Sequence, residues 1–256
     1  MIHEQAIIEE GAIIGKNVTI GPWTYISKNV VIGDDCHISA NVVINGPTRM
    51  GKGNRIFQFA SIGEDCQDLK YAGEPTELII GDNNVFRESC TIHRGTIQDQ
   101  GITQIGNNNL FMAYTHVAHD CMVGNNCILA NNASIAGHVH VGDYAILGGM
   151  SGVHQFCHIG AHSFVAATSL ILKDVPPYVM ASGNGAKPFG LNTEGLKRRG
   201  FSADTIRSIK QAYRKVYRQG LTVEAAILEI KENIESSDEL TLFIDFIESS
   251  NRGIIR

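Results

Sequence analysis

The strongest constraint on this chain is an apolar residue at every sixth position. One ladder runs from Ile8 to Ile92, with an interruption after Ile62. A second ladder, shifted by one residue, runs from Ile105 to Ile171. Neither an amphipathic helix nor an alternating strand holds a period of six over this length. A solenoid does, because each repeat buries one residue against the coils above and below it.

The repeat unit predicts the shape of the solenoid. An apolar residue is followed by a small residue or glycine and then by two polar residues, as in Ile14–Thr19. Glycine and asparagine suit corners that need a positive φ. Three flat sides per turn give a coil of about 18 residues, with neighbouring strands about 4.8 Å apart. We therefore expect a three-sided prism of parallel β-strands.

The ladder is interrupted twice and then ends. The interruptions, near residues 65–78 and 96–103, predict loops on the surface of the prism, which in solenoids often lie at the binding face. After Gly190 the pattern becomes helical, and Ser202, Thr222 and Asp238 can each start a helix. We expect a mainly β chain with a β-helix over residues 1–190 and a C-terminal helical domain over residues 191–256.

Composition sets broad limits on function. The net charge of −5 gives no general reason to expect nucleic-acid binding, and no apolar run approaches the roughly 20 residues of a membrane span. The first ten residues carry acids and enter the ladder at once, so we expect no secretory signal and a cytoplasmic protein. We assign all six cysteines to the slot two residues before a ladder position, where other repeats hold small residues. This pattern favours packed, reduced thiols over a metal site or disulfides.

Four apolar residues predicted to face outward recur every eighteen residues: Leu110, Ile128, Ile146 and Phe164. Stacked on one side, they would form a stripe too large for a solvated face. The C-terminal helices could cover it. Contact between subunits is the stronger interpretation, and a three-sided prism suits a cyclic homotrimer.

Histidines concentrate in one part of the solenoid, and the coil length predicts their neighbours. Eighteen residues separate His119 from Gly137 and Asp120 from His138. A histidine beside an aspartate points to a general base, and a nearby glycine lets a backbone N–H approach a developing oxyanion. No serine or cysteine stands out as a nucleophile, which favours direct transfer. The residues expected on one edge are His116, His119, Asp120, Gly137, His138, His154 and Gln155. We expect His37, His140, His158 and His162 to be ordinary solvated side chains.

The repeat resembles that of the left-handed parallel β-helix acyltransferases, and the left hand follows from this resemblance alone. Further segments narrow it, over essentially the whole chain, to the UDP-N-acetylglucosamine O-acyltransferase family. They are Gln67–Pro75, His116–Asp120, Leu129–Asn132, Gly148–Met150, Val153–Phe156 and Asn192–Phe201. The resemblance implies transfer of a (3R)-3-hydroxyacyl chain from acyl carrier protein to the glucosamine 3-hydroxyl of UDP-N-acetylglucosamine. This is the first step of lipid A biosynthesis, and it needs no metal or other cofactor.

The resemblance also implies roles for single residues. His119 matches the general base, Asp120 the carboxylate that orients it, and the N–H of Gly137 the oxyanion donor. Ala167 matches the position that limits acyl-chain length. The positions implied to contact substrate are Gln67, Asp68, Lys70, His116, His138, His154, Gln155, Asn192, Glu194, Arg198 and Arg199, and the two arginines suit a diphosphate.

A basic patch is the expected docking surface for acyl carrier protein, which is small and acidic. It consists of Lys197, Arg198, Arg199, Arg207, Lys210, Arg214, Lys215 and Arg218. Such a patch on a net-acidic chain fits electrostatic steering of an acidic partner. An ordinary solvated helix face is about as compatible with the sequence alone.

Three alternatives stay open at this stage. The UDP-3-O-acylglucosamine N-acyltransferase is expected to carry a separate uridine-binding domain before its β-helix, for which a ladder beginning at Ile8 leaves no room. A metalloenzyme of the carbonic anhydrase type needs three histidines around zinc, and His116 and His119 could supply two. A non-catalytic solenoid is disfavoured by the clustered histidine, aspartate and lysine residues.

Overall fold

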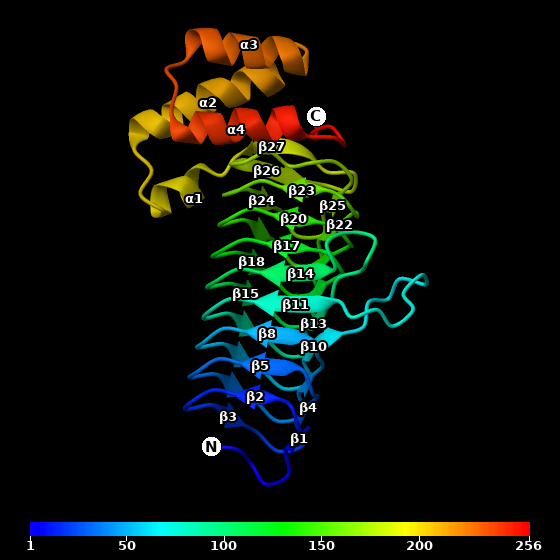
Figure 1. Ribbon diagram of the computed structural model, residues 1–256. Coiled ribbons are helices and arrows are strands. Elements are labelled where there is room, and N and C mark those ends of the chain that lie inside the picture. Colours follow the sequence, from blue (N-terminus) through cyan, green and yellow to red (C-terminus); the bar gives the residue numbers. More distant parts are fainter.

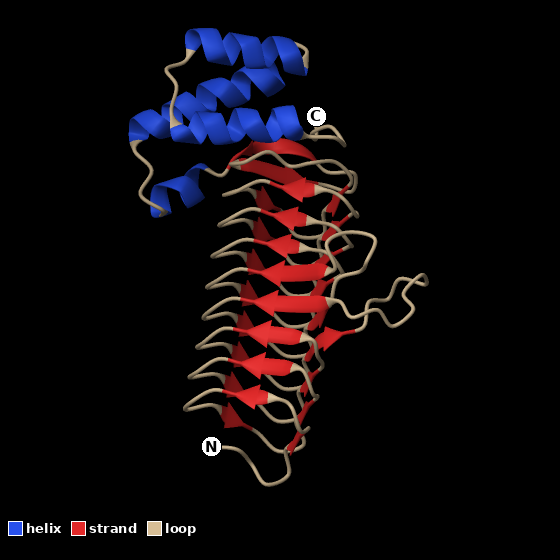
Figure 2. Cartoon of the chain, in the orientation of Figure 1, coloured by secondary structure: helices blue, strands red, loops and turns tan.

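The computed structural model, which covers residues 1–256, is a left-handed parallel β-helix capped at one end by helices (Figure 1). Each coil adds one strand to each of three sheets. Successive coils pair in register, so that Ile128 lies beside Ile146, eighteen residues later. Figure 2 shows the strands stacked along the prism, with the N-terminus at the end away from the helices. The predicted fold class is confirmed.

The sheets are numbered in the order in which a coil enters them. Sheet 1 consists of β1 (Ile7–Ile8), β4 (Tyr25–Ile26), β7 (Val43–Ile44), β10 (Ser61–Glu64), β13 (Thr91–His93), β16 (His116–Val117), β19 (Ser134–Ile135), β22 (Gly152–Val153) and β25 (Leu170–Ile171). Sheet 2 consists of β2 (Ile13–Ile14), β5 (Val30–Ile32), β8 (Thr48–Met50), β11 (Glu77–Ile80), β14 (Ile102–Ile105), β17 (Met122–Val123), β20 (His140–Val141) and β23 (His158–Ile159).

Sheet 3 closes the triangle and ends in a hairpin. Its strands are β3 (Thr19–Ile20), β6 (His37–Ile38), β9 (Arg55–Ile56), β12 (Val85–Phe86), β15 (Leu110–Phe111), β18 (Ile128–Leu129), β21 (Ile146–Leu147), β24 (Phe164–Val165), β26 (Val179–Ser182) and β27 (Lys187–Leu191). The β26–β27 pair is antiparallel, unlike every other pair in the solenoid. The six-residue pattern does not extend to this hairpin, which the sequence did not predict.

The ladder residues fill the interior of the prism. From Ile20 to Ile171, no ladder side chain is more than 4% exposed. Burying each such side chain stabilises the fold by about 2 kcal/mol. All six cysteines are buried and unpaired, as expected. The slot assigned to Cys66 is wrong, because this residue follows β10 in the first loop that leaves the prism.

The corners use positive φ and glycine for different purposes. Twenty non-glycine residues have φ between 55° and 70°, many of them asparagines as expected, but Trp23 also adopts this conformation. The repeat glycine Gly33, by contrast, does not adopt a positive φ. A Cβ there would lie 2.6 Å from the carbonyl carbon of Gly51 in the next coil. Glycine at this position therefore permits close approach between coils rather than a left-handed turn.

Two excursions leave the prism on the same side (Figure 1). The first excursion, residues 65–76, connects β10 to β11, and the second excursion, residues 94–101, connects β13 to β14.

The four helices at the C-terminal end of the prism are α1 (Thr193–Arg198), α2 (Ala203–Arg218), α3 (Val223–Asn233) and α4 (Asp238–Ser249). None is both long and apolar enough to cross a membrane. Ser202 and Thr222 cap α2 and α3 as predicted, whereas Ser237 caps α4. The short α1 was not predicted.

Candidate active site

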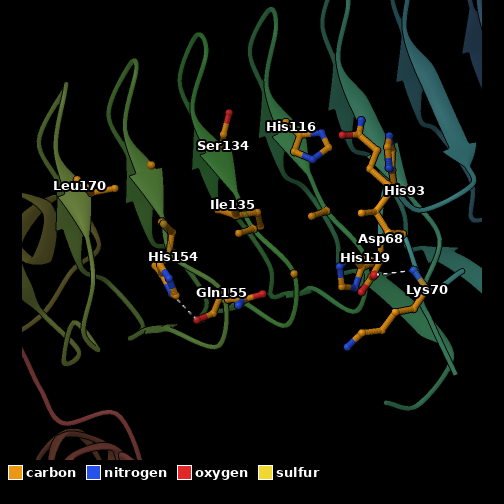
Figure 3. A pocket seen from close by; sticks show the side chains of 17 residues that line it. Asp68, Lys70, His93, His116, His119, Ser134, Ile135, His154, Gln155 and Leu170 are labelled. Atoms are coloured by element: carbon orange, nitrogen blue, oxygen red, sulfur yellow. Dashed lines mark hydrogen bonds between the residues drawn. The ribbon is translucent and has the colours of Figure 1, made fainter. Parts of the chain in front are cut away.

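A cleft of about 720 Å³ follows the outer face of sheet 1 and the edge where sheet 1 turns into sheet 2 (Figure 3). Its floor is a row of outward-facing positions from successive coils: His116, Ser134, Gly152 and Leu170. Residues Gln67–Lys70 of the first excursion line one end, near His119, and Leu170 lies at the other. His154 and Gln155 also line the cleft. The parallel register therefore turns distant sequence positions into one groove.

His119 and Asp120 form a hydrogen-bonded pair at this edge. Nδ1 of His119 lies 2.8 Å from Oδ2 of Asp120. Asp120 is 2% exposed and also accepts hydrogen bonds from the backbone N–H and the hydroxyl of Thr96, at 2.8 and 2.6 Å. Burial acts to raise the pKa of Asp120, but the hydrogen bonds from His119 and Thr96 outweigh it, and the pKa falls below its ordinary value. An ionised carboxylate only accepts, so the proton of the neutral imidazole resides on Nδ1 and leaves Nε2 free as a base.

Gly137 lies directly against the other side of the His119 ring. A Cβ added to Gly137 would lie 2.5 Å from Cε1 and 2.6 Å from Nε2 of His119. The N–H of Gly137 has no acceptor within the protein, and the same holds for His119 and Gln155 at the equivalent corner positions. A free amide is therefore an ordinary property of this edge. The missing side chain of Gly137 is what brings that amide next to a base.

His138 is held beside this pair by the second excursion. Its ring stacks on Phe156, with ring centroids 4.4 Å apart, and meets the His119 ring edge-on at 5.1 Å. Nδ1 of His138 lies 3.0 Å from a carboxylate oxygen of Asp99 in the second excursion, and Nε2 lies 3.8 Å from Oδ2 of Asp120. His138 thus adjoins the base without lining the cleft of a single chain.

Two neutral histidines lie deeper in the cleft. Nδ1 of His116 lies 2.7 Å from the hydroxyl of Thr91, and the His116 ring meets the ring of His93 edge-on at 5.0 Å. Burial and the neighbouring His119 lower the pKa of His116. Burial, followed by the charge of His116, lowers the pKa of His93 to about 4. Both rings are therefore uncharged hydrogen-bonding groups near neutral pH.

The predicted site residues did not include His93, Thr96, Asp99, Ser134 and Leu170. The reason for missing His93 is that the second excursion lengthens its coil. His116 pairs with Thr91, twenty-five residues earlier rather than eighteen. Correcting the coil length for the inserted residues would have placed His93 beside the predicted edge. Thr96 and Asp99 lie inside the excursion itself, where the repeat gives no positional information.

Five predicted site residues lie away from the cleft of a single chain: Asn192, Glu194, Arg198, Arg199 and Ala167. The side chain of Asn192 caps α1 and donates to the carbonyl of His162, at 2.9 Å. The guanidinium of Arg199 lies over the ring of Tyr144 and donates to the Tyr144 carbonyl. These contacts place α1 at the edge between sheets 2 and 3. Ala167 is exposed at the edge between sheets 3 and 1.

One group of side chains could offer three metal ligands. Atoms of His119, Asp120 and His138 lie within 4.8 Å of one another. The group contains two histidines and a carboxylate, whereas the carbonic anhydrase alternative calls for three histidines. The Asp120 carboxylate is already engaged by His119 and Thr96. The arrangement therefore matches an oriented base better than a zinc site.

Comparisons with known proteins identify the family. A family model described as UDP-N-acetylglucosamine O-acyltransferase, domain 2, matches residues 174–255. A model for bacterial transferase hexapeptide repeats matches residues 11–46 and 102–137. Two similar solved structures cover 100% of this chain and 99% of their own. LpxA from Acinetobacter baumannii is 53% identical with a TM-score of 0.97, and the UDP-N-acetylglucosamine O-acyltransferase of Moraxella catarrhalis is 52% identical with a TM-score of 0.97.

A curated relative extends the similarity over the full length. The acyl-(acyl-carrier-protein)–UDP-N-acetylglucosamine O-acyltransferase of Stutzerimonas stutzeri is 54% identical over 256 residues, which is 100% of this chain and 99% of the relative. The cleft, the His119–Asp120 pair and the C-terminal helices all lie within the matched region. The chain therefore belongs to the UDP-N-acetylglucosamine O-acyltransferase family.

Proposed function

We propose that this chain transfers a (3R)-3-hydroxyacyl chain from acyl carrier protein to the 3-hydroxyl of UDP-N-acetylglucosamine, in the cytoplasm, as the first step of lipid A biosynthesis. The observation that carries the proposal is the position of His119, bonded to Asp120 on one side and packed against Gly137 on the other. The names of the full-length relatives support the choice of donor and acceptor.

The proposed reaction is a single displacement at the thioester carbon. Nε2 of His119 takes the proton from the sugar 3-hydroxyl as that oxygen attacks the carbonyl. The carbonyl oxygen becomes an oxyanion, which the N–H of Gly137 stabilises. Collapse of this intermediate breaks the carbon–sulfur bond, and the imidazolium returns the proton to the departing thiolate. Asp120 holds Nδ1–H throughout and stabilises the imidazolium.

An acyl-enzyme intermediate is disfavoured by the state of the nearby thiol. Cys121 follows Asp120 in sequence, but it is fully buried in the prism, and burial raises its pKa to about 12. A neutral, enclosed thiol is a poor nucleophile. The hydroxyl of Thr96 donates to Asp120 and is equally occupied. These facts favour direct attack by the sugar hydroxyl.

We further propose that the working form is a homotrimer. The predicted outward stripe stacks in register on sheet 3, from Leu110 through Ile128 to Phe164. Within one chain, Asn192, Glu194, Arg198 and Arg199 lie at a different edge from the cleft. A neighbouring copy that presents its α1 edge to this cleft would supply the groups that bind the nucleotide and its phosphates.

We propose that residues 191–256 form a separate C-terminal domain and that this domain docks acyl carrier protein. Lys210, Arg214 and Arg218 line a cavity of about 550 Å³ beside β27. This concentration of positive charge supports α2 as the docking surface for acidic acyl carrier protein. The proposal requires no cofactor beyond the phosphopantetheine arm of the donor.

Mass spectrometry of the product tests the proposed activity. The purified chain is given UDP-N-acetylglucosamine and a mixture of hydroxyacyl carrier proteins, beside a His119→Ala variant. We expect a 3-O-acylated product, formed about 10³-fold more slowly by the variant. Acylation of UDP-3-O-acylglucosamine instead would establish the N-acyltransferase. Absence of product from both acceptors would overturn the proposal.

A further inference from the structure

We propose that Arg94 is the positioning residue that fixes the first excursion, residues 65–76, over the cleft. The proposal rests on the proposed function, because Arg94 acts through Gln67, Asp68 and Lys70, which we assign to substrate binding. Arg94 itself does not line the cleft.

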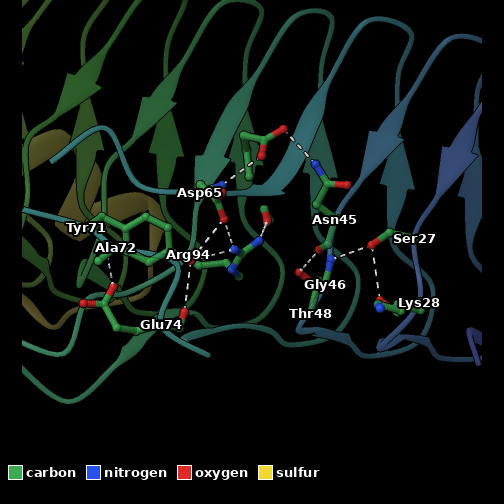
Figure 4. Close-up of polar contacts among 12 residues, drawn as sticks. Ser27, Lys28, Asn45, Gly46, Thr48, Asp65, Tyr71, Ala72, Glu74 and Arg94 are labelled. Atoms are coloured by element: carbon green, nitrogen blue, oxygen red, sulfur yellow. Dashed lines mark hydrogen bonds and ion pairs between the residues drawn. The ribbon is translucent and has the colours of Figure 1, made fainter. Parts of the chain in front are cut away.

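The guanidinium of Arg94 contacts the start and the middle of the first excursion (Figure 4). Arg94 is 6% exposed and is the first residue after β13. Nη1 donates to the carbonyl of Gly63, at 2.5 Å. Nη2 donates to the carboxylate of Asp65, where the excursion begins, and to the hydroxyl of Tyr71, at 3.1 Å. One planar cation thereby ties the start of the loop to Tyr71, which suits the fork of an arginine better than the single ammonium of a lysine.

Tyr71 extends this tie to the far end of the loop. Its hydroxyl accepts from Arg94 and lies 3.0 Å from the carbonyl of Glu74, to which it can donate. The carboxylate of Glu74 in turn accepts from the N–H of Ala72, at 2.9 Å. The chain between these anchors carries Gln67, Asp68 and Lys70 to the cleft.

The first excursion has little apolar packing of its own. Only Cys66 and Thr76 among its residues are buried, and Leu69 is fully exposed. Hydrogen bonds to a charged group in a partly buried site are the strongest interactions that remain to hold it. The polar tie to Arg94, rather than a hydrophobic core, therefore determines where the substrate-binding residues lie.

The position of Arg94 in the chain connects this loop to the catalytic pair. His93, on one side, lines the cleft, and Thr96, two residues beyond Arg94, donates two hydrogen bonds to Asp120. A single segment thus holds the loop and the carboxylate in fixed relation.

The test combines proteolysis with kinetics on the full chain. In Arg94→Met, we expect trypsin to cleave after Lys70 about tenfold faster under native conditions. We expect the KM for UDP-N-acetylglucosamine to rise about tenfold while kcat stays within about twofold. Arg94→Lys, which keeps the charge, should recover part of both effects. Arg87→Met is the matched control, since exposed Arg87 hydrogen-bonds Glu88 and lies over the ring of Phe57, and it should change neither.

The outcomes separate this proposal from the proposed function. Proteolysis after Lys70 needs no substrate, so it reports on the tie even if the assigned acceptor is wrong. Unchanged cleavage would overturn the tie. Faster cleavage with an unchanged KM, or a fall in kcat alone, would overturn the role in substrate positioning. Should Arg94→Met fail to fold, Tyr71→Phe removes the hydroxyl link only, and it should raise cleavage and KM in the same direction.

Discussion

Two edges of the prism carry histidines, and they differ in what surrounds the ring. At the edge between sheets 1 and 2, His119 bonds a buried carboxylate and faces a cleft. At the edge between sheets 2 and 3, the ring of His162 lies among Tyr144, Tyr178 and Phe201, with centroids 4.9 to 5.7 Å away. Burial, followed by the charge of Arg199, lowers the pKa of His162 to about 4. The hydrogen-bond partner and the open space, not the histidine's place in the coil, distinguish the proposed base from a packing residue.

The expectation for the histidines outside the cleft is corrected in part. We expected His37, His140, His158 and His162 to be ordinary solvated side chains, and His37 and His140 are exposed as expected. His162 is half-buried, and the rings of His140 and His158 stack in parallel with centroids 4.6 Å apart. Residues eighteen apart on a prism share a face, so these two rings stack; His158 is half-buried, while His140 stays exposed. The repeat aligns side chains whether or not they have a catalytic role.

The largest effect that would sharpen this contrast is expected from Asp120→Asn. An amide can donate to His119 and stabilise the wrong tautomer, so kcat should fall about 10³-fold. Asp143→Asn is the matched control at the other edge, where Asp143 accepts from the N–H of Asn125, at 2.7 Å. Steady-state kcat values of the two variants test this prediction. Equal losses of kcat would contradict a functional difference between the two edges.

A charge introduced at Ile128 tests whether the two edges meet between copies. Ile128→Glu places a charge within the stacked apolar stripe, so light scattering should detect monomers or insoluble protein. Loss of the neighbour's arginines should lower activity about 30-fold or more. A variant that stays trimeric would contradict the assigned interface. A fully active monomer would show that one chain holds a complete site.

At the second edge, we expect pH to change the stability of the fold rather than the rate of catalysis. Between about pH 6.5 and pH 4, unfolded His162 binds a proton that the folded residue does not, so unfolding becomes easier as pH falls through this range. After allowance for solvent screening, the loss is about 1 kcal/mol. His162→Phe should flatten the difference between urea unfolding at pH 7 and at pH 5 while preserving kcat at pH 7. An unchanged pH dependence would argue against a buried neutral imidazole.

The smallest effect is expected at the third edge, where Ala167 lies. Ala167→Gly removes one methyl group from the position matched to chain-length selection. The preferred hydroxyacyl chain should stay the same or lengthen, as measured by mass spectrometry of products from a donor mixture. Preference for a shorter chain would contradict the assignment of this position.

The sequence predicted what a fixed period can predict. The ladder identified the interior, and the eighteen-residue spacing placed His119 against Gly137, because regular coils convert sequence distance into spatial distance. The caps of α2 and α3 depend on local chemistry at Ser202 and Thr222 and were equally visible.

Features that break or exceed the period escaped prediction. The second excursion shifted the register and concealed His93. A buried asparagine ladder was also missed: the side-chain oxygen of Asn54 accepts from the N–H of Asn84, and that of Asn84 accepts from the N–H of Asn109. These residues occupy the small slot of the repeat, so their polarity became explicable only once neighbouring coils supplied partners. The role of Arg94 depends on contacts between two excursions, for which no repeat rule exists.

The free amide at successive turns of the His119 edge has a consequence for redesign. Each of these coils offers a free N–H donor at this edge. Only at Gly137 does that donor lie beside a histidine ring, that of His119. Moving the histidine and the glycine to the equivalent positions of the next coil would shift the reacting centre about 4.8 Å along the prism. The distance from the reacting centre to the end of the groove would change by the same amount. The acyl-chain length of the product could therefore be altered in steps of one coil.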